Sequence, residues 1–162
     1  MRDINDDQVD YLKKTKPKVL INTCGPFQTA NYKIVENCIL TKTNYIDLAD
    51  GRDFVTKMKE YHGRALRSHT TVIPGASSVP GLSSAVLEEY KDEFKEIDKV
   101  WYGISPGQRT TRGGIATVKG VLSYIGKPIR PFGNLEKPIY GWQDTYSEKY
   151  PGGIGKRLFS NC

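Results

Sequence analysis

Hydrophobic residues along the first hundred positions recur with two different periods, and each period predicts one kind of element. Short apolar runs that end in turn-forming residues or alternate with polar ones predict β-strands at 19–23, 45–49, 70–73 and 97–104. Apolar residues three or four positions apart predict amphipathic helices at 5–14, 30–42, 50–66 and 80–94. A further helix is predicted at 115–125, and the many Pro and Gly residues beyond Gly126 predict loops and short edge strands.

The alternation of helices and strands predicts an α/β fold whose parallel sheet is covered by helices on both faces. Val19, Leu20 and Ile21 place apolar side chains on both sides of their strand, which indicates burial between helices. The two long helices are expected to bury one stripe each, Phe54, Val55, Met58, His62, Ala65 and Leu66 in the first and Leu82, Ala85, Val86, Tyr90 and Phe94 in the second. His62 is therefore predicted to be packed, and His69 to lie at a helix end.

Composition narrows the class of protein. The 162 residues are 38% hydrophobic and 26% charged, as in a globular chain, and the longest apolar runs are far too short to cross a bilayer. Three cysteines without a Cys-x-x-Cys unit argue against a disulfide framework or a zinc site and favour a reduced, cytoplasmic compartment. The net charge of +6 comes from basic residues scattered among acids, which favours a solvated surface over nucleic-acid binding.

The loops after the first three strands are the candidate ligand site, because parallel sheets bind ligands beyond the carboxyl ends of their strands. The loop at 23–28 contains a Gly-Pro turn that lets the main chain approach a ligand, or simply joins strand to helix. In the loop at 49–53, Asp50 is favoured as a helix cap over a ribose ligand. The loop at 74–81 fits an anion, a polarised carbonyl or an ordinary capped helix. Cys24 is favoured as a small buried thiol over a nucleophile.

Three motifs carry a resemblance to a known family. They are Val19-Leu20-Ile21-Asn22-Thr23-Cys24-Gly25-Pro26-Phe27, Tyr45-Ile46-Asp47-Leu48-Ala49-Asp50-Gly51 and Pro74-Gly75-Ala76-Ser77-Ser78-Val79-Pro80-Gly81-Leu82. In order and spacing they resemble the saccharopine dehydrogenase-like oxidoreductases. The resemblance implies the C-terminal half of a Rossmann-like sheet at 1–95 and the start of an α/β substrate or dimerisation domain at 96–162. It also implies NAD or NADP as cofactor, with Thr23, Cys24, Gly25, Pro26, Phe27, Asp50, Gly75 and Gly81 as cofactor-binding residues.

The chain departs from the family pattern in two places. Saccharopine-handling members often carry an acid where this chain has Val79, which argues against saccharopine as the small-molecule substrate; no catalytic residue is assigned. The Gly-x-Gly-x-x-Gly turn that holds the pyrophosphate in that family is missing, so the chain is expected to be a fragment that starts after the first βαβ units. No cofactor is expected to bind to this chain alone.

The missing first strand leaves the 19–23 strand as an expected sheet edge, and we expect a homodimer that pairs through it. The leading hypothesis is thus a truncated NAD(P)-dependent oxidoreductase that is inactive by itself. A non-catalytic interaction or scaffold domain and a basic nucleic-acid-binding module are the alternatives, the latter unlikely, and no membrane partner is expected.

Overall fold

A computed structural model describes residues 3–98, 100, 102–104, 114–129, 139–150 and 153–160. The chain forms two compact units, Met1–Asp98 and Lys99–Cys162.

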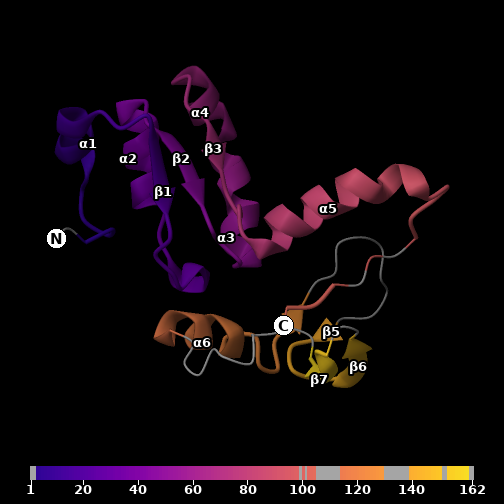
Figure 1. Ribbon diagram of the computed structural model, residues 1–162. Helices are drawn as coiled ribbons and strands as arrows, with labels where there is room; N and C mark the ends of the chain where they lie inside the picture. The colour runs from indigo at the N-terminus through magenta and orange to yellow at the C-terminus, as the bar shows by residue number, and fades with distance from the viewer. Residues whose placement is uncertain are drawn as a thin grey trace. The chain divides into compact units, whose positions relative to one another are not determined.

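The first unit is built around a parallel sheet. Its elements are α1 (Val9–Thr15), β1 (Val19–Asn22), the 3₁₀ turn η1 (Phe27–Thr29), α2 (Lys33–Thr41), β2 (Asn44–Asp47), α3 (Arg52–Lys57), the 3₁₀ turn η2 (Met58–Tyr61), α4 (His62–Arg67), β3 (Val72–Ile73), the π-helical turn η3 (Ser78–Leu82), α5 (Ser83–Tyr90) and the 3₁₀ turn η4 (Lys91–Glu93). The strands lie in the order β1-β2-β3 (Figure 1). The predicted α/β class and parallel sheet are confirmed at this level.

One face of the sheet is covered. The register aligns Leu20 with Tyr45 and Tyr45 with Val72, so these three side chains share a face. Tyr45 is fully buried there, and Leu20 and Val72 pack at the margin of the same core. The core consists of Leu12, Phe27, Ile34, Val35, Cys38, Ile39, Tyr45, Ala49, Phe54, Met58 and Ala65. The core therefore lies between the sheet and the helices that connect its strands.

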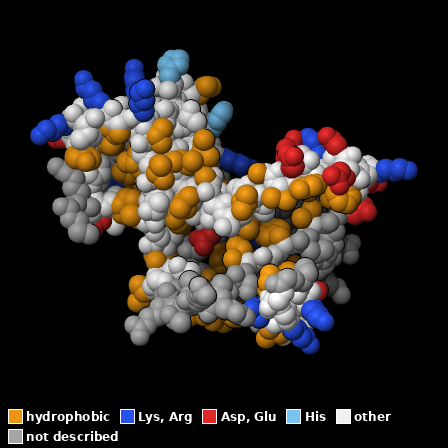
Figure 2. Space-filling model, viewed as in Figure 1, with side chains coloured by type: hydrophobic (Ala, Val, Ile, Leu, Met, Phe, Trp, Pro, Cys, Tyr) orange, Lys and Arg blue, Asp and Glu red, His pale blue; other side chains and the backbone are white. Residues whose placement is uncertain are grey.

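The opposite face is bare within the described part of the first unit, so the prediction of a sheet covered on both sides is wrong there. Val19, Ile21 and Ile73 point to this face, and Ile21 and Ile73 are 65% and 47% exposed. Figure 2 shows hydrophobic side chains gathered over the strands. The reason is topological: both crossovers step in the same direction along the sheet, and right-handed crossovers in one direction place their helices on one face.

β1 lies at an edge of this sheet. The carbonyls of Lys18 and Asn22 accept hydrogen bonds from β2 and the residue after it, at 3.2 and 3.3 Å. Backbone groups alternate in direction along a strand, so those of Val19 and Ile21 point outward. No other described strand pairs with that side. Pairing of a second copy along this edge stays a prediction.

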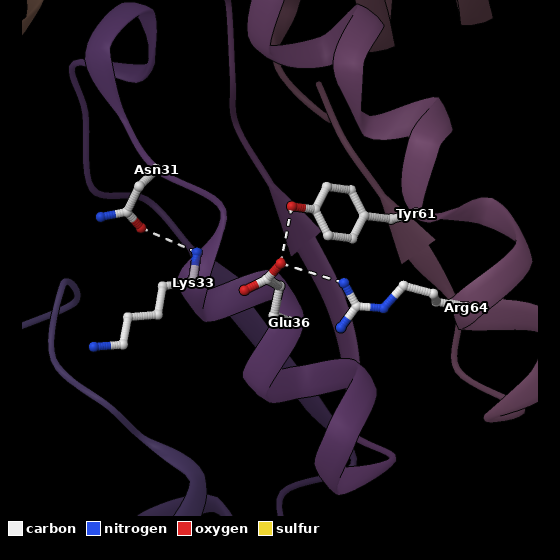
Figure 3. A network of polar contacts seen from close by, with 5 residues as sticks. All are labelled: Asn31, Lys33, Glu36, Tyr61 and Arg64. Atoms are coloured by element: carbon white, nitrogen blue, oxygen red, sulfur yellow. Dashed lines mark hydrogen bonds and ion pairs between the residues drawn. The ribbon is translucent and has the colours of Figure 1, made fainter.

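A polar network joins α2 to the helices beside it (Figure 3). One carboxylate oxygen of Glu36 accepts a hydrogen bond from the Tyr61 hydroxyl at 3.2 Å and lies 3.3 Å from the Arg64 guanidinium. The Asn31 side chain accepts a hydrogen bond from the Lys33 main chain at the start of α2. Burial and the nearby Glu36 raise the pKa of Tyr61 to about 12. Since the ion pair is half-exposed, it orients the helices and contributes little stability.

The helix predicted at 80–94 forms as η3, α5 and η4, but its predicted burial is wrong. None of the residues of α5 is buried, and Leu82 and Val86 are 63% and 51% exposed. The helix runs away from the sheet (Figure 1). Helical spacing is a local property, whereas burial needs a neighbouring surface, and the described part of the first unit does not bury this stripe.

The strand predicted at 97–104 is absent from the described residues of that range, which are 97–98, 100 and 102–104. Lys99 and Trp101 lie outside the described residues. A strand needs a neighbour for its backbone hydrogen bonds, and alternation of side chains does not supply one.

The second unit contains short elements, as predicted beyond Gly126. They are α6 (Ile115–Leu122), β4 (Pro128–Ile129), β5 (Ile139–Tyr140), β6 (Tyr146–Tyr150) and β7 (Gly155–Phe159). The strands pair antiparallel as β4 with β5 and β6 with β7. The described residues of both units include no helix of the length and apolarity that a membrane span requires.

Candidate functional site

The loops that follow β1, β2 and β3 meet at the carboxyl end of the sheet. This meeting is expected for parallel strands, whose carboxyl ends share one edge. What holds the loops together is a set of hydrogen bonds and close backbone contacts, centred on Asp47.

Asp47, the last residue of β2, connects the second loop to the third. Its Oδ1 accepts hydrogen bonds from the main-chain N–H of Ala49 at 2.9 Å and of Gly75 at 2.8 Å. Its own carbonyl accepts from the N–H of Ala76 at 2.8 Å. The side chain is fully buried. Sequence reasoning missed this role, although an aspartate inside an apolar strand is a signal that it has buried partners.

Two further buried polar side chains, Asn22 and Tyr45, lie beneath the first loop. Asn22 donates a hydrogen bond from Nδ2 to the Tyr45 hydroxyl at 3.0 Å, and its Oδ1 accepts from the N–H of Cys24 at 3.0 Å. Burial, helped by the nearby Asp47 and opposed by the Asn22 hydrogen bond, raises the pKa of Tyr45. The Asp47 Oδ2 is buried with no hydrogen-bond partner among the described residues. The ends of β1 and β2 are thus tied to the loops by the buried polar side chains of Asn22 and Asp47.

The first loop contacts the second directly. Gln28 donates a hydrogen bond from Nε2 to Oδ1 of Asp50 at 3.1 Å. A Cβ on Gly51 would lie 3.3 Å from the main-chain nitrogen of Gln28, so the two loops pack backbone to backbone. The predicted capping role of Asp50 is wrong: α3 starts after Gly51 without a side-chain cap. The Asp50 carboxylate instead accepts its hydrogen bond from Gln28, which is distant in sequence.

The Phe27 ring anchors the first loop in the core. It packs against the Phe54 ring of α3 with the two ring centroids 5.4 Å apart. The Tyr32 ring in turn stacks on Phe54 with a centroid distance of 4.7 Å. Phe27 is buried, so its ring belongs to the core and its backbone to the loop.

Two glycines fix the shape of the third loop. Gly75 has φ +73°, and a Cβ there would lie 3.2 Å from the Pro80 ring. A Cβ on Gly81 would lie 3.2 Å from the carbonyl of Gly75. The loop therefore folds tightly back on itself.

The other predicted site residues are at the surface. Thr23, Cys24 and Gly25 are exposed, and Pro26 is half-buried. The favoured interpretation of Cys24 as a buried thiol is therefore wrong. Of the two cysteines in the described residues, Cys38 is the buried one, and burial raises the pKa of its thiol to about 12. Cys24 ends up exposed because its strand-end loop lies outside the core.

The histidines lie away from these loops. His62 is exposed on α4, so its predicted packing is wrong, because the helix turns that edge of its stripe outward. His69 follows the end of α4, as predicted. The described residues contain no cluster of three or more His, Cys, Asp or Glu able to hold a metal ion.

The loops present the exposed residues Thr23, Cys24 and Gly25 and the exposed residue Asp50, which carries a carboxylate, to solvent. Comparison with known proteins adds no family: no family model matches the chain, and no curated protein matches it.

Proposed function

We propose that this chain is part of an NAD(P)-dependent oxidoreductase of the saccharopine dehydrogenase-like type, and that its strand-end loops contact the dinucleotide. The observation that supports this proposal is the joining of three loops at the carboxyl end of a parallel sheet. These are the same loops whose sequences resemble that family.

Each loop has a distinct part in the proposal. The exposed residues Thr23, Cys24 and Gly25 run along the dinucleotide, and the Asp50 carboxylate accepts a hydrogen bond from a ribose hydroxyl. The loop between Gly75 and Gly81 faces the nicotinamide end. The cofactor supplies the hydride chemistry, while the protein binds and orients.

The residues present fit only part of such a cofactor. The sequence has no Gly-x-Gly-x-x-Gly turn, so this chain offers no pyrophosphate cradle of that kind. We therefore propose weak binding of NADP or NAD by the chain alone and derive no catalytic step.

The test is a titration of the ¹⁵N-labelled chain with NADP⁺ and NAD⁺, followed by NMR. We expect a dissociation constant of about 1 mM or weaker, with shift changes confined to the three loops. Shift changes elsewhere, or none at about 10 mM cofactor, would contradict a cofactor site at these loops. A dissociation constant near 1 µM would instead contradict the proposal that the site is incomplete.

A matched pair of variants sharpens the test. Asp50→Asn removes the carboxylate from the second loop and should weaken binding about three- to tenfold. Asp10→Asn makes the same change on an exposed position of α1 and should leave binding unchanged. Equal weakening in both variants would indicate a general charge effect.

A second candidate function, a non-catalytic interaction domain, is favoured by the exposed apolar stripe of α5 and the bare sheet face.

A further inference from the structure

An apolar groove lies beside the free edge of β3. Val55 and Met58 line it from α3 and η2, Leu66 lines it from α4, and Val72 and Pro74 line it from the β3 side. Its volume is about 660 Å³. The groove is on the covered side of the sheet, next to the last helix of the core.

The topology explains which kind of element fits this groove. α2 and the α3–α4 segment connect successive strands and lie on the same face. A right-handed crossover that left β3 in the same direction would place its helix next, beside α3–α4. The groove is thus the position for a helix that follows β3.

In this chain the helix after β3 is α5, and the loop that joins β3 to α5 points the helix away from the groove (Figure 1). Gly75 and Ala76 are both hydrogen-bonded to Asp47, and Leu82 donates to the Ser77 carbonyl at 2.9 Å. These bonds fix the turn from which α5 runs away from the sheet (Figure 1). The chain's own α5 therefore does not fill its own groove.

α5 presents an exposed apolar stripe, which matches the apolar lining of the groove. Leu82, Val86 and Tyr90 are four residues apart, share one side of the helix and are exposed. Figure 2 shows this line of hydrophobic side chains along the helix, with acidic side chains beside it. An exposed apolar stripe of this length favours burial against a partner.

The charges found at the two surfaces are opposite in sign. Among the described residues that line the groove, Lys59 is basic and none is acidic. Segment 83–93, which forms α5 and η4, carries four acidic residues and one basic residue. Complementary charge of this kind orients two surfaces and speeds their association.

We propose that the groove is occupied by α5 of a second copy of this chain. The exchange is reciprocal: each copy inserts α5 into the groove of the other, which closes a two-fold dimer. This inference does not depend on the proposed cofactor site.

The test is the oligomeric state, measured by sedimentation equilibrium on the chain and on variants of exposed residues. Val86→Glu on α5 and Leu66→Glu in the groove should each weaken the dimer by about tenfold or more. An equimolar mixture of the two variants should recover a heterodimer, since one of its two contacts is intact. Ile21→Lys, on the bare sheet face at β1, is the matched control and should leave the dimer unchanged. Circular dichroism verifies that each variant is folded.

Three results would overturn the proposal. One is a monomeric chain at about 100 µM. Another is a dimer that Ile21→Lys abolishes and Val86→Glu does not, which would indicate packing through the bare sheet face. The third is a disulfide of the L66C/V86C variant that forms within one chain, which would place α5 in its own groove.

Discussion

The two faces of the three-stranded sheet carry similarly apolar side chains and differ in what covers them. Tyr45 of β2 is buried against the helices, whereas Ile21 of β1 and Ile73 of β3 are largely exposed on the opposite face. Hydrophobicity alone therefore does not decide burial in this protein. The direction of the crossovers does, because it assigns every connecting helix to one side.

The largest expected effect comes from truncating a residue on the covered face. Tyr45→Ala removes a buried ring and leaves a cavity, so we expect the free energy of unfolding to fall by about 3–5 kcal/mol. Ile21→Ala on the bare face should change it by about 0.5 kcal/mol or less. Urea unfolding followed by circular dichroism measures both. Equal losses would mean that the bare face is covered in solution.

The next effect tests the polar end of the covered face. Asp47→Ala leaves the N–H groups of Ala49 and Gly75 without their acceptor, which should cost about 2–4 kcal/mol in the same unfolding assay. Asp47→Asn keeps an oxygen at that position and should recover about half of the loss. If Asn is no better than Ala, the charge of the carboxylate matters more than its two hydrogen bonds.

The smallest effect concerns the helix layer above the covered face. The pKa of Tyr61 is about 12 in the folded protein, above its ordinary value of 10.0, so the folded state favours the neutral phenol. The resulting stabilisation is complete below pH 10 and is lost as the pH rises toward 12. Tyr61→Phe removes this group and should flatten the fall in unfolding free energy over that pH range. Some dependence remains, because the pKa of Tyr45 is raised as well. An unchanged slope in the variant would contradict the shift at Tyr61.

Local pattern was sufficient to predict most elements of the first unit, although the single helix predicted at 50–66 forms as α3, the 3₁₀ turn η2 and α4. The runs that became β1, β2 and β3 and the helical spacing that became α2 and α4 are properties of neighbouring residues. The meeting of the strand-end loops was predictable too, since parallel strands place their carboxyl ends together.

What the sequence did not predict depends on distant partners. The Asp50 side chain bonds Gln28, which arrives from another loop, instead of capping its own helix. The stripe on α5 has the spacing of a buried helix, yet the turn held by Asp47 carries it away from the core. The position of Asp47 in an apolar strand indicates buried partners, but which groups it bonds depends on the third loop.

Because a single carboxylate holds both Ala49 and Gly75, the second and third loops are not independent. A molecule that shifts one of them by a fraction of an ångström strains a hydrogen bond to the other. Substitutions in the two loops should consequently have non-additive effects on any affinity measured there, with Asp47 as the residue through which that coupling passes.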